Sequence, residues 1–182
     1  MSPLNIIEKY YQKNTPLYEI LISHSVSVAQ KALQIIENKQ LNVDKNFVQE
    51  AAMLHDIGIF LTNAPSILCF GTHEYVEHGY LGAKILREEK LPKHARVCER
   101  HTGTGITLRE IIDRQLPLPQ RDMQPISLEE QLICYTDLFF SKTNLGTEKS
   151  IEKVREKVAV LEKKTGEKSI ERFENWVNIF GE

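Results

Sequence analysis

Cysteine is scarce in this sequence, and its scarcity excludes two kinds of cross-linked protein. The 182 residues include three cysteines, Cys69, Cys98 and Cys134, and no two of them form a CxxC pair. An odd number without paired spacing indicates neither a disulfide framework nor a zinc ribbon. Each cysteine lies beside apolar residues, so we expect three buried free thiols.

The sequence also lacks an excess of one charge and any long apolar run. It has 23 Lys and Arg residues against 25 Asp and Glu residues, a formal net charge of −2. This balance excludes a polybasic protein that binds nucleic-acid polymers through counterion release. No apolar window approaches the 18 residues or so of a membrane span, and the first residues, MSPLNIIEKYYQKN, lack the apolar core of a signal peptide. We therefore expect a cytoplasmic protein with no membrane partner.

Helical periodicity is what the sequence has in abundance. Hydrophobic residues make up 41% of the chain, enough for a buried core. Thr15-Pro16 is a helix start signal, and Ser127 and Glu130 have the spacing of a capping box. The run from Ala51 to Leu61 is apolar except at two residues and predicts the end of a central, buried helix. We expect seven helices, over about residues 16–37, 45–61, 75–89, 92–103, 127–142, 150–164 and 167–180.

These helices predict an all-α fold, since no strand pattern is stronger than the helical one. We expect one domain over residues 1–182, with a core at 20–142 and C-terminal helices at 150–180 packed on it. Residues 62–74 and 102–125 should be loops. The second loop is long enough to be a lid or a binding loop, with a helical turn or two within it.

Polar residues at inward positions of the helices carry the chemical signal. A buried carboxylate without a partner costs on the order of several kcal/mol, so Asp56, beside His55 in the apolar run, needs a partner. For that dipeptide alone, a hydrogen bond between the two side chains would be sufficient. Five predicted helices, however, each direct a histidine or an aspartate inward, and one directs both: His24, His55, Asp56, His78, His101 and Asp137. A shared ligand would explain them all, and imidazole and carboxylate groups suit iron, manganese, zinc, nickel or cobalt.

The order of these residues resembles a known family. His24, then His55-Asp56-Ile57-Gly58, then Asp137 is similar to the H…HD…D signature of the HD-domain metal-dependent phosphohydrolases in its HDIG form. His78 and His101 resemble the two extra histidines of the dinuclear branch. The chain also resembles an HDIG group, common in archaea, with a stretch similar to Pro119-Gln-Arg-Asp122. The resemblance covers about residues 20–142 and implies an HD-type helical bundle.

The resemblance also implies roles for the six residues. His24, His55, Asp56 and Asp137 would hold a first divalent ion, and Asp56 would bridge to a second ion held by His78 and His101. One or two ions are thus expected as cofactors, with Asp56, His78 and His101 as the catalytic residues. A water activated by the metal would attack phosphorus.

Two departures from the family pattern limit the choice of substrate. The branch named HD-GYP has a lysine directly after HDIG, where this chain has Ile59. Residues 102–106 replace its GYP segment. Hydrolysis of a cyclic dinucleotide is therefore not indicated.

Other polar residues near the six are candidates for substrate binding. Arg100, Arg121 and Lys142 could bind phosphate, and His73 could be a general acid or support a metal ligand. For each, simple solvent exposure is the alternative. His94, near a predicted helix start, is expected at the surface.

These observations predict an enzyme that hydrolyses a small phosphate ester, a nucleotide-like phosphomonoester or phosphodiester. Two alternatives use the same ligands: an HD-type diiron oxygenase, and a sensor that binds metal or nucleotide without catalysis. The near-neutral charge favours a small molecule as partner over a nucleic-acid polymer. The apolar residues of the last two helices would cover the core or form a homodimer face.

Overall fold

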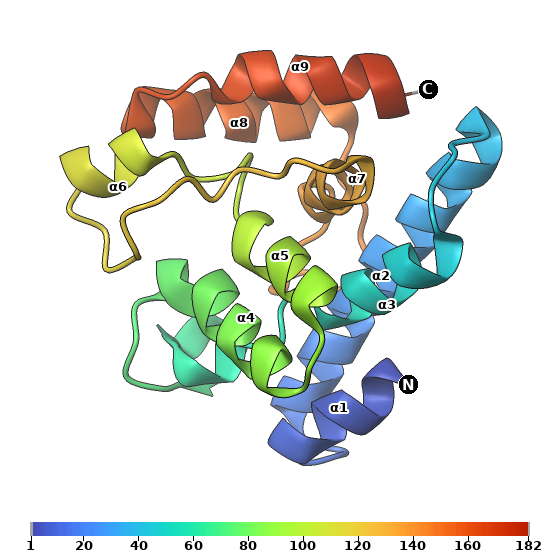
Figure 1. Ribbon diagram of the computed structural model, residues 1–182, viewed down its shortest axis with the longest axis vertical. Coiled ribbons are helices and arrows are strands. Elements are labelled where there is room, and N and C mark those ends of the chain that lie inside the picture. The colour runs from blue at the N-terminus through green and yellow to red at the C-terminus, as the bar shows by residue number, and fades with distance from the viewer. Residues whose placement is uncertain (1, 182) are drawn as a thin grey trace.

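Nine α-helices make up most of the computed structural model, which describes residues 2–181 (Figure 1). The all-α class is confirmed. Two-residue strands, β1 (Asn63–Ala64) and β2 (Cys69–Phe70), pair antiparallel within the expected loop at 62–74. The helices are α1 Pro3–Tyr10, α2 Pro16–Lys39, α3 Lys45–Leu54, α4 His78–Glu88, α5 Pro92–Arg100, α6 Leu108–Asp113, α7 Leu128–Asp137, α8 Ile151–Thr165 and α9 Ser169–Phe180.

Side-chain caps set several helix starts. The Thr15 side chain accepts a hydrogen bond from the Tyr18 backbone N–H at the start of α2, and the Ser127 side chain accepts one from the Glu130 N–H at the start of α7. Such caps satisfy N–H groups that lack a partner within the helix. Both starts agree with the prediction. Of the nine helices, α1 was not expected, and α6 is the short helix within the loop at 102–125.

Two helices end at least five residues earlier than predicted. The helix expected to reach Leu61 ends at Leu54, and a turn and a 3₁₀ helix (Ile59–Leu61) follow it. A Cβ atom on Gly58 would lie 2.3 Å from the His78 carbonyl oxygen, so the chain at Gly58 passes directly against α4. The apolar run is therefore buried without forming a continuous helix, and Leu54, Ile57 and Ile59 all belong to one hydrophobic core.

The second early end is that of α7, at Asp137 instead of about Lys142. The Lys149 ammonium donates hydrogen bonds to the Leu138 and Phe140 carbonyl oxygens, at 3.3 and 2.6 Å. These carbonyls follow the helix and have a lysine as their partner in place of helical N–H groups.

The apolar side chains form two main cores, and the predicted ligands lie between them. One core joins α2, α3, α5 and α7 to the C-terminal helices, which lie side by side across one edge of the molecule (Figure 1). The other joins α1, α2 and α4 to the segment after α3. On α2, His24 lies between Leu21 of the second core and Val28 of the first. The boundary between the cores is thus where the polar residues collect.

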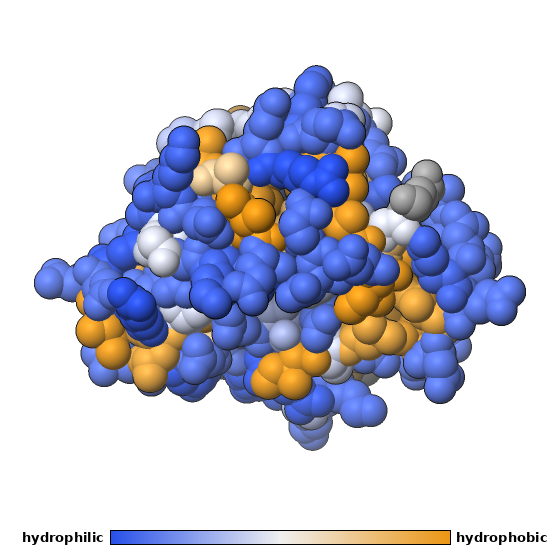
Figure 2. Space-filling view, turned by 90° about the horizontal axis from the view of Figure 1, so that it is seen from above, coloured by the Kyte–Doolittle hydropathy of each residue, from blue (hydrophilic) through white to orange (hydrophobic). Residues whose placement is uncertain are grey.

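The surface over the C-terminal helices is mainly polar (Figure 2). The face seen over α8 and α9 is hydrophilic with separate hydrophobic patches (Figure 2). Among the helices within residues 2–181, none combines the length and apolar character that crossing a membrane requires. All three cysteines are buried and free, as predicted.

His94 corrects one expectation. Its side chain is buried instead of exposed: its ring packs edge-on against Phe47, with centroids 5.0 Å apart, and its Nε2 lies 3.3 Å from Glu50 Oε2. The apolar contact with Phe47 explains why a histidine so close to a helix start is not at the surface.

Candidate metal centre

Helix ends position five of the six predicted ligands. His55 and His101 are the C-cap residues of α3 and α5, and Asp56 directly follows the first of them. His78 is the first residue of α4, and Asp137 is the last residue of α7. His24 lies within α2. The fold therefore brings six side chains from five segments to one place.

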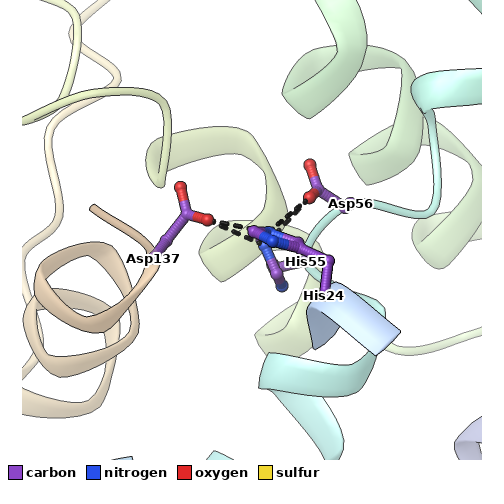
Figure 3. Close-up of side chains that lie close together, drawn as sticks. All are labelled: His24, His55, Asp56 and Asp137. Carbon is purple, nitrogen blue, oxygen red and sulfur yellow. Dashed lines mark ion pairs between the residues drawn. The ribbon is translucent and has the colours of Figure 1, made fainter. Parts of the chain in front are cut away.

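Four of these side chains form a first cluster (Figure 3). His24 Nε2 lies 3.1 Å from Asp56 Oδ2 and 2.9 Å from Asp137 Oδ1. His55 Nε2 lies 3.1 and 3.5 Å from the same two oxygens. One ligand atom of each residue lies within 4.8 Å of every other. This grouping is the size of a single metal site.

The other carboxylate oxygen of Asp56 faces a second cluster. Asp56 Oδ1 is 3.4 Å from His78 Nε2 and 3.4 Å from His101 Nε2. The two nitrogens are 3.0 Å apart. One carboxylate thus lies between two sets of histidines, with Oδ2 toward one set and Oδ1 toward the other.

Backbone carbonyls orient three of the four histidine rings. Nδ1 of His55, His78 and His101 lies 2.6, 2.6 and 2.7 Å from the carbonyl oxygen three residues earlier in the chain. A carbonyl only accepts, so each Nδ1 carries the proton and donates it. In the neutral ring, the lone pair is then on Nε2, which is the atom that points into its cluster.

Four of the ligand atoms are buried and have no aligned hydrogen-bond partner within the described residues. These atoms are His24 Nε2, His55 Nε2 and both carboxylate oxygens of Asp56. They approach one another closely, yet no pair has hydrogen-bond geometry. His78 and His101 in their neutral forms would oppose two lone pairs at 3.0 Å. A bound cation satisfies both conditions, so the residues fit one divalent ion in each cluster.

Charges within and beside the first cluster shift the pKa values of its members. Burial acts to raise the pKa of Asp56, but the charges of Lys142 and then His55 outweigh it and hold that pKa well below its usual range. Burial acts to lower the pKa of His55, yet contacts with Asp56 and Asp137 raise it to about 10. Without metal, this cluster therefore holds a proton on His55 at neutral pH.

The second cluster behaves in the opposite way. Burial, with the nearby His101 ring as the next cause, lowers the pKa of His78 to about 3. This imidazole is neutral at physiological pH, which is the form that binds metal.

An open pocket of about 460 Å³ adjoins both clusters. Three of the six ligands line it: His78, His101 and Asp137. Lys142 also lines it, and its Nζ lies 2.6 Å from Asp56 Oδ2 with 11% of the side chain exposed. A small molecule in this pocket would reach the ligands and an ammonium group together.

The four candidates for substrate binding lie in different places. Lys142 is in the pocket, whereas Arg100, Arg121 and His73 are not among the residues that line it. Arg100 donates to both carboxylate oxygens of Glu130, at 3.1 and 2.8 Å. Arg121 pairs with Glu99, and His73, with 45% of its side chain exposed, contacts Glu77 at 3.1 Å. For these three residues, substrate binding stays a prediction.

Tyr75 and Lys157 are two of the pocket residues that were missed at the level of the sequence. The Tyr75 ring stacks on His78, with centroids 4.6 Å apart, and its position three residues before a predicted ligand is a signal that could have found it. Lys157 of α8 also lines the pocket. It is one of several lysines on that helix, so the sequence carries no signal for it.

A family model and a curated protein match most of this chain. A family model described as the HD domain matches residues 21–140. The chain is 35% identical over 148 residues to the uncharacterized protein MJ0778 of Methanocaldococcus jannaschii, covering 77% of this chain and 78% of that protein.

Two longer proteins are also similar. Each is named tRNA (cytidine(56)-2'-O)-methyltransferase. The one from Picrophilus torridus is 31% identical over 120 residues, and the one from Thermoplasma volcanium is 30% identical over 141. These matches cover 65% and 76% of this chain but only 31% and 37% of the two methyltransferases. No solved structure shows a significant match.

Proposed function

This chain belongs to the HD-domain family, and we propose that it is a metal-dependent phosphohydrolase that cleaves a small phosphate ester. The observation that carries the proposal is the position of Asp56, whose two buried oxygens face two separate histidine clusters beside an open pocket. Asp56 could serve both clusters, and two-ion sites are typical of phosphatases.

The ligand assignment follows from the two clusters. His24, His55, Asp56 and Asp137 would hold one ion, and Asp56, His78 and His101 would hold the other. The donor set of imidazole and carboxylate suits iron, manganese, zinc, nickel or cobalt. When bound, such ions supply Lewis-acid stabilisation of phosphoryl charge and lower the pKa of water.

The residues of the chain itself bind and orient the ester. The Lys142 ammonium, beside Asp56 and open to the pocket, would donate to a phosphoryl oxygen. Carbonyl contacts at Nδ1 keep three imidazoles in place, and burial of five of the six ligands excludes bulk water around them.

The pocket also supports a small substrate. A volume of about 460 Å³ suits one small organic phosphate of nucleotide size. Transfer of a methyl group to tRNA, the activity in the names of two relatives, is not carried over, because this chain spans only about a third of their length.

The test is hydrolysis by purified protein loaded in turn with each of the five metals. The substrates are a panel of phosphomonoesters and phosphodiesters. We expect turnover with at least one ester, and a loss of at least about 100-fold in kcat for Asp56→Ala, because both clusters lose their shared carboxylate. Asp113→Ala is the matched control, since Asp113 is an exposed aspartate paired with Arg109 on α6.

Two results would contradict the proposal. One is the absence of turnover with every metal and ester, and the other is turnover that Asp56→Ala leaves intact. Oxygen consumption by iron-loaded protein with an organic substrate, and no phosphatase activity, would indicate the oxygenase alternative.

A further inference from the structure

One wall of the pocket comes from beyond the segment that matches the family. The match ends at residue 140, whereas Ser141, Lys142 and Thr143 line the pocket from the turn after α7, and Lys157 lines it from α8. We therefore expect the groups that determine substrate specificity to lie on this wall.

Packing fixes α8 next to the metal ligands. Gly103, two residues after His101, lines the pocket. A Cβ atom at Gly103 would lie 3.1 Å from Leu161 Cδ2. Leu161 follows Lys157 by four residues and so lies on the same face of α8. The helix face that carries Lys157 thus packs on the segment beside the second cluster.

The pocket has a positive wall once the ligands are occupied. Its charged side chains, apart from histidine, are Asp137, Lys142 and Lys157. Asp137 belongs to the first cluster, so a bound cation would neutralise it. Among residues 2–181, no carboxylate lies within 4.0 Å of the Lys157 ammonium, whereas Lys142 is already held by Asp56. Lys157 is therefore a cation free to bind a ligand.

The charges of Lys142 and Lys157 also act on a third amine, that of Lys149. Burial is the main cause that lowers the pKa of Lys149 to about 8, and the charges of Lys157 and Lys142 contribute to the shift. The charge of Asp137 acts in the opposite sense. An anion in the pocket would weaken the repulsion among these positive charges.

Apolar side chains line the pocket as well. Ile67, Tyr75 and Phe140 present apolar surface, and the Tyr75 ring is fixed by its stacking on His78. The pocket therefore offers a surface for an organic group as well as sites for charged groups.

We propose that the substrate carries two anionic groups, the phosphate ester that is cleaved beside Asp56 and Lys142 and a second anion that Lys157 binds. The organic part between them packs on Tyr75 and Phe140. This inference rests on the proposed function for the ester, and it assigns Lys157 as a specificity-determining residue. A carboxylate and a second phosphate share the chemistry that Lys157 would recognise.

The experiment compares two matched pairs of compounds. Glycerol 3-phosphate and 3-phosphoglycerate differ by a carboxylate, and adenosine 5′-monophosphate and adenosine 3′,5′-bisphosphate differ by a phosphate. We measure kcat and KM for wild type, Lys157→Gln and the control Lys163→Gln, which removes an exposed lysine of α8 outside the pocket. Calorimetric titration of the metal-loaded proteins with the same four compounds measures the Kd of each, separately from turnover.

In at least one pair, we expect Lys157→Gln to raise the KM or Kd of the compound with two anionic groups about tenfold. The KM or Kd of the compound with one anionic group should change less than about twofold. Lys163→Gln should change neither. The pair that responds identifies the second anion as carboxylate or phosphate.

Equal effects on both members of each pair, or no effect in either pair, would overturn the inference even if the esters are hydrolysed. Selective loss of binding without any hydrolysis would support the anion site while contradicting the proposed hydrolase function. The two failures are therefore distinguishable.

Discussion

The proton on His55 links the metal site to pH at the scale of a single residue. Contacts with Asp56 and Asp137 raise its pKa to about 10 in the metal-free protein. A metal ligand must be deprotonated, so an ion that binds at His55 has to displace this proton. Metal affinity therefore depends on the protonation of His55 as well as on the ion.

We predict that metal binding at pH 7 releases about one proton from the first cluster. Because protonated His55 competes with the ion, affinity should increase as pH rises toward the pKa of about 10. Calorimetry in two buffers of different ionisation enthalpy measures the number of protons. Equal binding enthalpies in the two buffers would contradict the prediction.

His94 makes a separate prediction about stability. Burial, the main cause, lowers its pKa below the ordinary value of 6.5, although Glu50 acts in the opposite sense. Above pH 6.5 the histidine is neutral in both the folded and the unfolded state. As pH falls below 6.5, the unfolded state takes up a proton that the folded state resists, so stability is lost.

The variant His94→Gln should therefore lose less stability than wild type between pH 7 and pH 5. Denaturant unfolding at the two pH values measures the difference. His73→Gln is the control, because His73 is exposed. A pH dependence identical to that of wild type in His94→Gln would show that His94 does not contribute.

At the scale of elements, Gly58 allows α4 to pack closely against the turn that follows α3. A Cβ atom on Gly58 would be 2.3 Å from the His78 carbonyl oxygen and 2.4 Å from the Gly82 backbone nitrogen. Both contacts are with backbone atoms, which cannot move aside as a flexible side chain could. The glycine after His55-Asp56-Ile57 thus sets the distance between Asp56 and the helix that begins at His78.

Gly58→Ala should lower the free energy of unfolding by about 2 kcal/mol or more, since α4 must shift to accept the methyl group. The same shift moves His78, so we expect weaker binding at the second cluster than at the first. Urea unfolding and metal analysis measure these effects.

Gly146→Ala is the control, because a Cβ atom there meets nothing within 4 Å. Its positive φ of 71° alone should cost about 1 kcal/mol. A loss in Gly58→Ala no larger than in this control would contradict the packing argument.

Tertiary contacts also explain what the sequence could not predict about the elements. Periodicity located α2, α5 and α7 and placed the six ligands on inward positions, because those patterns are local. The close approach of Gly58 to His78 and Gly82 joins residues twenty or more positions apart. The position of Lys157 depends on the contact between Leu161 and Gly103. No local pattern contains either contact.

At the scale of the whole molecule, metal and fold are linked. The ligands come from α2, the segment after α3, α4, α5 and α7, so an ion holds together segments of both main cores. An ion that binds only the folded state stabilises it by mass action.

A chelator should therefore lower the melting temperature of metal-loaded protein. The stabilisation it removes is about 2.7 kcal/mol where the free metal concentration is 100 times Kd. Differential scanning calorimetry with and without the chelator measures the effect, and Asp56→Ala should respond less than wild type. Melting curves that coincide with and without the chelator would contradict the presence of a resident ion.

The spacing of the ligands along the chain has a consequence for biosynthesis. His24, His55, Asp56, His78 and His101 all precede α6, whereas Asp137 is the last residue of α7. A ribosome therefore delivers all three ligands of the second cluster before the last ligand of the first. The first cluster therefore reaches its full set of four ligands only when α7 has been synthesised.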